Sequence, residues 1–162
     1  LFCQTLVMWG CGFLKQNVMS YDLKPRNKKI EEVRFGAIWS IMLQETGMGY
    51  VLGYGANITP ASYVYNTGRK GSPVSNDGYR VSSDEAKAMA KVARGYISVK
   101  RFINKQYEEA SDEQKNNWKS ALYYGEKGLV KKLYEQEVSE DLLLKIEKFA
   151  DFAENSNGFA IT

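Results

Sequence analysis

The sequence predicts an α+β fold in which a small antiparallel sheet of two to four strands in the N-terminal half packs against a predominantly helical C-terminal half. Two observations predict it. Short stretches rich in Tyr and Val, separated by Gly, Pro and Asn turn residues, occupy much of the first eighty residues. After Ser82, apolar residues recur at helical spacing. The chain has 162 residues, 44% of them hydrophobic and 25% charged, so it can bury the core of one domain.

The first eighteen residues differ in character from the rest. The apolar run Leu1–Leu14 is too short to cross a membrane, and no basic stretch precedes it. Met19 then begins the more polar stretch MSYDLKPRNK. We therefore expect residues 1–18 to be an upstream extension outside the functional fold, and residues 19–162 to form a single α+β domain. The alternative, that residues 1–18 pack on the core as a strand or helix, stays open.

The region before Ser82 is expected to supply the strands. A strand at 21–23 ends at Pro25, and a helix is predicted by apolar residues at helical spacing and ends at Gly47. The interspersed Gly, Tyr and Val of the following stretch favour a strand. The expected elements are strands at 21–23, 48–55 and 62–65 and a helix at 30–45, with 56–81 forming a loop-rich segment that holds one or two edge strands and, from residue 75, a turn and a short extended piece before the next helix.

The stretch SNDGYRVSSDEAKAMA, residues 75–90, is the clearest local signal. Asn76-Asp77-Gly78 is strong turn chemistry, and Ser82 followed by Glu85 predicts a capping box at a helix N-terminus. We expect this helix to continue to about Glu109. Further helices are predicted after Ser111, at 129–134 and after Ser139, the last ending at 155–158.

The chain contains no histidine, which excludes Ser-His-Asp and Cys-His mechanisms and typical zinc enzymes. Its two cysteines, Cys3 and Cys11, do not form a metal-binding pattern or a disulfide framework. We expect no cofactor and no metal, and a reduced, cytoplasmic protein without a membrane segment. The glycines at 47, 49, 53 and 55 follow a helix instead of preceding one, so they do not predict a phosphate-binding loop.

The charge is uneven along the chain. Residues 1–81 carry nine basic and five acidic side chains, whereas residues 82–162 carry thirteen and fourteen. An anionic partner is therefore expected to meet the N-terminal half, where the basic run from Lys24 to Lys29 can attract it.

Tyrosines, amides and basic side chains alternate between residues 50 and 80. Such a segment can recognise a partner protein or a polar, anionic ligand, and aromatic faces beside Arg or Lys can also bind nucleic acid. The alternative is that these tyrosines are ordinary strand residues. The candidate ligand-binding residues are Tyr50, Tyr54, Asn57, Tyr63, Tyr65, Asn66, Arg69, Lys70, Tyr79 and Arg80.

From Met19 the chain resembles small bacterial and phage proteins of uncharacterised function. The resemblance is carried by MSYDLKPRN at 19–27, GYVLGYG at 49–55 and SNDGYRVSSDEAKAMA at 75–90, and it covers residues 19–105. It implies a cytoplasmic accessory protein of bacterial or phage origin, and it implies no activity, cofactor or catalytic residue.

Three functions follow from these observations. We expect a non-enzymatic binding or regulatory protein that uses the segment 50–80. The first alternative is a nucleic-acid-binding accessory protein, and the second is an enzyme without histidine that relies on Asp77, Glu85 and a lysine or tyrosine. The C-terminal helices either complete the core or form a dimer face through Trp118, Tyr123 and Tyr134.

Overall fold

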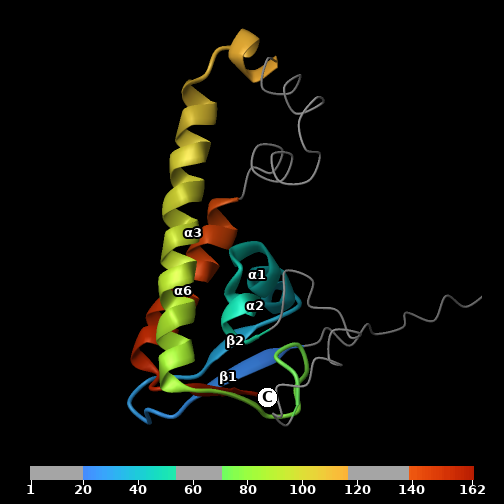
Figure 1. The fold of residues 1–162 in the computed structure, drawn as a ribbon, viewed down its shortest axis with the longest axis vertical. Coiled ribbons are helices and arrows are strands. Elements are labelled where there is room, and N and C mark those ends of the chain that lie inside the picture. The colour runs from blue at the N-terminus through green and yellow to red at the C-terminus, as the bar shows by residue number, and fades with distance from the viewer. Residues whose placement is uncertain (1–19, 54–70, 117–138) are drawn as a thin grey trace, which may run out of the picture.

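The fold is α+β, as the sequence predicts: a four-stranded antiparallel sheet packs against helices (Figure 1). The computed structural model describes residues 20–53, 71–116 and 139–162. The elements are β1 (Tyr21–Pro25), β2 (Val33–Phe35), α1 (Ile38–Thr46), α2 (Met48–Val51), β3 (Tyr79–Val81), α3 (Ser83–Glu109), α6 (Glu140–Asn155) and β4 (Phe159–Ile161).

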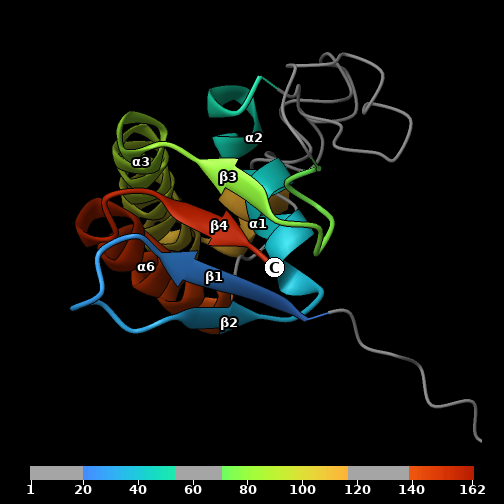
Figure 2. The same cartoon turned by 90° about the horizontal axis from the view of Figure 1, so that it is seen from below.

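The last strand in the sequence lies inside the sheet. The strand order is β2-β1-β4-β3, and every neighbouring pair is antiparallel (Figure 2). Ala160 of β4 is in register with Lys24 of β1 on one side and with Arg80 of β3 on the other. The sheet therefore forms only when the C-terminus reaches back to the N-terminal strands.

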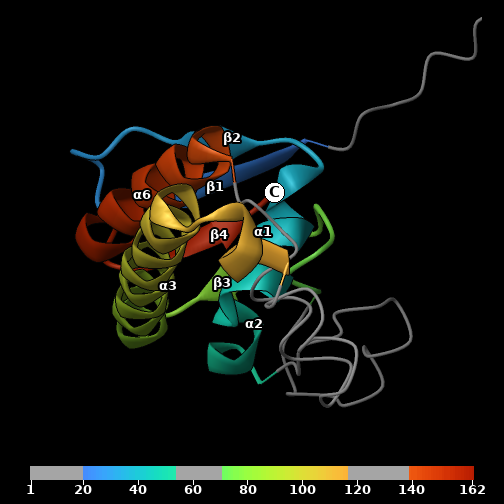
Figure 3. The same cartoon turned by 90° about the horizontal axis from the view of Figure 1, so that it is seen from above.

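The described helices lie on one face of this sheet, as the views from below and above show (Figures 2 and 3). α3 and α6 run side by side, and α3 extends well past the end of α6 (Figure 1). Arg94 of α3 binds Asp151 and Glu154 of α6 at 2.9 and 2.6 Å. About two turns further along α3, Arg101 forms a similar ion pair with Glu140 of α6 at 2.7 Å. These exposed pairs fix the alignment of the two helices more than they add stability.

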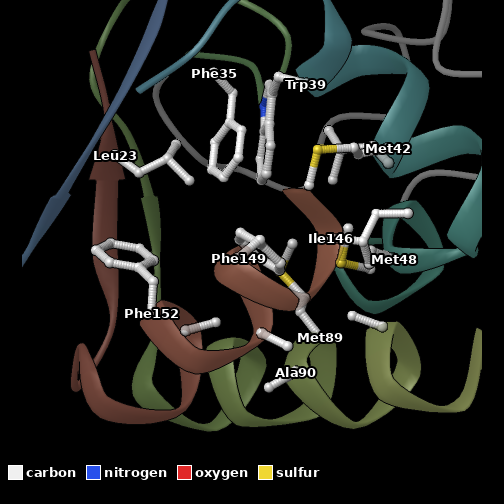
Figure 4. Packing of buried hydrophobic residues seen from close by; sticks show 14 of the residues in the cluster. Leu23, Phe35, Trp39, Met42, Met48, Met89, Ala90, Ile146, Phe149 and Phe152 are labelled. Carbon is white, nitrogen blue, oxygen red and sulfur yellow. The ribbon is translucent and has the colours of Figure 1, made fainter. Parts of the chain in front are cut away.

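The core joins the sheet to the helices through aromatic rings (Figure 4). The Phe149 ring of α6 lies 5.2 Å from Trp39 of α1 and 6.0 Å from Phe159 of β4, measured between ring centroids. Phe35 of β2 stacks on Trp39 at 6.1 Å. Residues from both ends of the chain thus meet around Phe149, which is fully buried.

Three of the helix starts predicted after residue 80 are confirmed, those at Ser82, Ser111 and Ser139. Ser82 and Glu85 form a complete capping box at the start of α3, which satisfies amides that lack a partner within the helix. Ser111 and Gln114 form the same reciprocal pair ahead of residues 112–116, which are helical. The Ser139 hydroxyl accepts a hydrogen bond from the Leu142 amide at the start of α6.

Two predictions for the N-terminal half are wrong. Residues 30–45 were expected to be one helix, but β2 occupies its first part and α1 begins only at Ile38. Val33 and Phe35 are buried with exposed Arg34 between them, which is the alternation of a strand. The expected strand at 48–55 contains instead the short helix α2, Met48–Val51. The strand expected at 62–65, the helix expected at 129–134 and the part of the Ser111 helix beyond residue 116 lie outside the described residues.

The tight turn between α6 and β4 depends on a glycine. Gly158 has a φ of +88°, and a Cβ placed there would lie 2.7 Å from the Val81 carbonyl oxygen. Gly78, at the start of β3, has a similar φ of +85° but has no atom within 4 Å of such a Cβ. The two glycines therefore separate the cost of the backbone conformation from the cost of a steric clash.

We expect Gly158→Ala to lower the free energy of unfolding by about 3 kcal/mol, because both strain and backbone contact act there. Gly78→Ala is the matched control and should cost only about 1 kcal/mol, the strain alone. Urea denaturation of the two variants measures the difference. Equal losses would show that β4 does not approach the β3–α3 junction as closely as described.

Candidate functional site: the open face of the sheet

The face of the sheet opposite the helices is polar and basic. Side chains alternate between the two faces of each strand, so buried residues on β1, β2, β3 and β4 have outward-facing neighbours. These outward residues are Asp22, Lys24, Arg34, Arg80 and Ala160, which together we call the open face. None of the described helices covers it (Figure 2).

Lys24 and Arg80 lie in one row across the open face. Each is exposed, and each is in register with Ala160 of the strand between them. Their Cα atoms are therefore about 10 Å apart, twice the spacing of neighbouring strands. Neither side chain forms an ion pair with a described residue. Because Ala160 is small, it leaves space between the Lys24 and Arg80 side chains. An anionic group in that space can contact both cations.

The row beside it holds a matched ion pair. The Arg34 guanidinium donates to both carboxylate oxygens of Asp22, at 2.6 and 3.0 Å. The hydrogen bond from Arg34 holds the pKa of the Asp22 carboxyl below its ordinary value, and the charge of Lys24 acts in the same direction. This acid is thus paired with Arg34, whereas no ion pair joins Lys24 or Arg80 to another residue in the described ranges.

Arg26 extends the basic surface beyond the end of β1. Its amide donates to the Gly158 carbonyl at 2.9 Å, which continues the β1–β4 ladder by one step. The side chain of Arg26 is exposed, two residues after Lys24. The basic run predicted from the sequence thus places Lys24 on the open face and Arg26 just beyond the end of β1.

The structure gives the predicted ligand-binding residues different positions. Arg80 lies on the open face, whereas Tyr79 points the other way and is 0% exposed, so it belongs to the core and not to a binding surface. Tyr50 is 64% exposed but lies on α2, among the helices. The remaining seven, Tyr54, Asn57, Tyr63, Tyr65, Asn66, Arg69 and Lys70, lie outside the described residues.

The two acids proposed for a histidine-free enzyme have structural partners. One Asp77 carboxylate oxygen accepts a hydrogen bond from the Ser72 amide at 3.2 Å and stabilises the turn before β3. The Glu85 carboxylate accepts hydrogen bonds from the Ser82 amide and hydroxyl at 2.9 and 2.8 Å. Both carboxylates therefore accept hydrogen bonds from nearby backbone amides and stabilise local structure.

A second polar group lies between α1 and α3. The ammonium of Lys100, which is only 5% exposed, lies 5.7 Å from the centre of the Tyr96 ring. Burial lowers the pKa of Lys100, although the negative charge of Glu45 opposes this. Burial raises the pKa of the Tyr96 phenol to about 12, and Glu45 acts in the same direction. The Tyr96 hydroxyl is buried without a hydrogen-bond partner among the described residues.

The described residues contain no group of three His, Cys, Asp or Glu side chains able to hold a metal ion. Within the same ranges, no helix combines the length and apolar character needed to cross a membrane. Comparisons with protein-family models, curated proteins and solved structures found no match. The resemblance to bacterial and phage proteins therefore stays a prediction.

Tyr96 should make the protein sensitive to alkaline pH. Its phenol loses a proton near pH 10 in the unfolded chain but only near pH 12 in the folded one. The free energy of unfolding is therefore unaffected by this group below pH 10 and falls as the pH rises from 10 to 12. Tyr96→Phe should remove part of that decline, as urea denaturation across the range will measure.

At neutral pH the same variant should be as stable as the parent or up to about 1 kcal/mol more stable, because a buried hydroxyl without a partner is removed. Tyr50→Phe is the matched control, since it removes an exposed phenol and should leave the alkaline decline in place. A Tyr96→Phe protein with the full alkaline decline would contradict the burial of this phenol.

Proposed function

We propose that the chain is a non-enzymatic binding protein whose open face docks on an acidic surface of a partner protein. The observation that carries this proposal is the row formed by Lys24 and Arg80 on either side of Ala160. Both cations are exposed, and the one acid of the open face is already paired with Arg34. Arginine binds carboxylates through two parallel hydrogen bonds, and lysine adds a second point charge beside it.

A macromolecular partner fits this surface better than a small ligand does. Small molecules bind mainly in concave sites that enclose most of their surface. The open face is one side of a four-stranded sheet with a small residue at its centre, so its charges are spread over a broad surface. Complementary charge on such a surface mainly raises the rate and specificity of association.

Nucleic acid is the second candidate, because Lys24, Arg26, Arg34 and Arg80 could follow a phosphate backbone. Proteins that bind single strands on a sheet usually add aromatic side chains on which the bases stack. The outward-facing residues described on this sheet include no aromatic side chain. An acidic protein surface is therefore preferred. The resemblance to small bacterial and phage proteins supports an accessory role in the bacterial cytoplasm.

The test compares two variants with the same change in net charge. Lys24→Glu/Arg80→Glu reverses the open-face row, whereas Lys87→Glu/Lys145→Glu reverses two exposed lysines on α3 and α6. Fluorescence anisotropy with a labelled Asp/Glu-rich peptide should show at least about a tenfold weaker affinity for the first variant and little change for the second.

Equal losses in both variants would reject the open face as the binding surface. A labelled single-stranded oligonucleotide, titrated at low and moderate salt, separates the candidates. Nucleic-acid binding that exceeds peptide binding and falls steeply with salt would replace the proposed partner by the second candidate. Binding of inorganic phosphate alone, at the affinity of the peptide, would show a small-anion site instead.

A further inference from the structure

The outer side of α3 carries the exposed apolar side chains of Val99 and Phe102, with half-buried Ala88 nearer its start. α3 buries Ala86, Ala90, Ala93 and Ile97 toward the core. Val99 and Phe102, in contrast, are 53% and 64% exposed. Ala88, Gly95 and Phe102 are spaced by seven residues, and Val99 falls between the last two, so all four lie along one side of the helix. We call this set the outer face of α3.

Gly95 makes no close packing contact with the described part of the chain. It lies in the interior of a helix of 27 residues, where glycine is the poorest choice after proline. A Cβ built at this position would meet no atom of the described residues within 4 Å, so none of them excludes a larger side chain. A glycine in such a place allows the backbone of another element to come close.

We propose that the outer face of α3 pairs with the same face of a second copy, the two helices running antiparallel and crossing at Gly95. A two-fold axis at Gly95 places residues at equal distances before and after it opposite each other. Phe102 then faces Ala88 of the second copy, a large side chain against a small one. This contact occurs twice by symmetry, and the two glycines let the helices approach closely.

The charges of α3 suit this arrangement. Asp84 lies eleven residues before Gly95 and Lys105 ten residues after it, so the antiparallel pair brings each Asp84 beside Lys105 of the other copy, in addition to the exposed 3.8 Å pair that Lys105 forms with Glu109 of its own helix. Both side chains are exposed. Lys91 lies opposite Val99, and its aliphatic stem can cover that side chain while its ammonium stays in water. A parallel pair would instead place Phe102 against Phe102 and Lys105 against Lys105.

The first test is the oligomeric state of the full chain. Sedimentation equilibrium at tens of micromolar should show a dimer. Gly95→Leu should dissociate it, raising the dissociation constant at least about tenfold, while circular dichroism shows unchanged helix content because the new side chain enters open space. Phe102→Glu should also give monomers without unfolding. Lys148→Leu, an exposed change on α6, is the control and should leave the dimer intact.

A monomeric parent protein would overturn the proposal, and so would a dimer or larger assembly that survives both Gly95→Leu and Phe102→Glu. The orientation is tested by disulfide trapping in a Cys3→Ser/Cys11→Ser background, mixing Ala88→Cys with Phe102→Cys. An antiparallel pair gives a mixed disulfide between positions 88 and 102, whereas a parallel pair gives 88–88 and 102–102 disulfides. These tests use no open-face residue, so they stand or fall independently of the proposed function.

Discussion

The ladder that β4 makes with β1 and β3 is the interaction on which the rest of the molecule depends. Phe159 and Ile161 face the core, where they are fully buried, and Ala160 faces outward between Lys24 and Arg80. Without β4, the β1–β2 hairpin and β3 would have no strand to join them. Because the partners of β4 are some 80 to 140 residues away in the sequence, the whole sheet forms as a non-local, cooperative unit.

Aromatic side chains of the core also hold in place the segment that leads into β3. The Trp39 indole donates to the Pro73 carbonyl at 2.7 Å, and the Tyr21 hydroxyl donates to the Val74 carbonyl at 3.0 Å. Both bonds anchor the segment that leads into β3. The position of Arg80 on the open face is therefore set by buried residues of β1 and α1, so core substitutions are expected to move the basic row as well as to destabilise the fold.

The parts of the fold and of the candidate site that depend on neighbouring residues could be predicted from the sequence. The parts that depend on distant residues could not. The capping boxes at Ser82 and Ser111 are complete within four residues, and both were predicted correctly. Val33 fits a helix and a strand equally well, so β2 was missed. β4 is a three-residue strand whose stability comes from distant partners. Arg80 was a candidate ligand-binding residue from the sequence. That it lies in one row with Lys24 follows only from the β4 strand between them.

The two proposed surfaces are compatible because α3 separates them. Its buried side faces the core, so its outer face points away from the sheet, and an antiparallel pair of α3 helices leaves both open faces uncovered. Exposed cations contribute little affinity one by one, since water and salt screen them. A dimer presents two basic rows at a fixed separation, and the second contact with a repetitive acidic partner becomes intramolecular. In the proposed dimer, the close approach at Gly95 would place two open faces in one particle, and the second contact would raise the affinity above that of a single face.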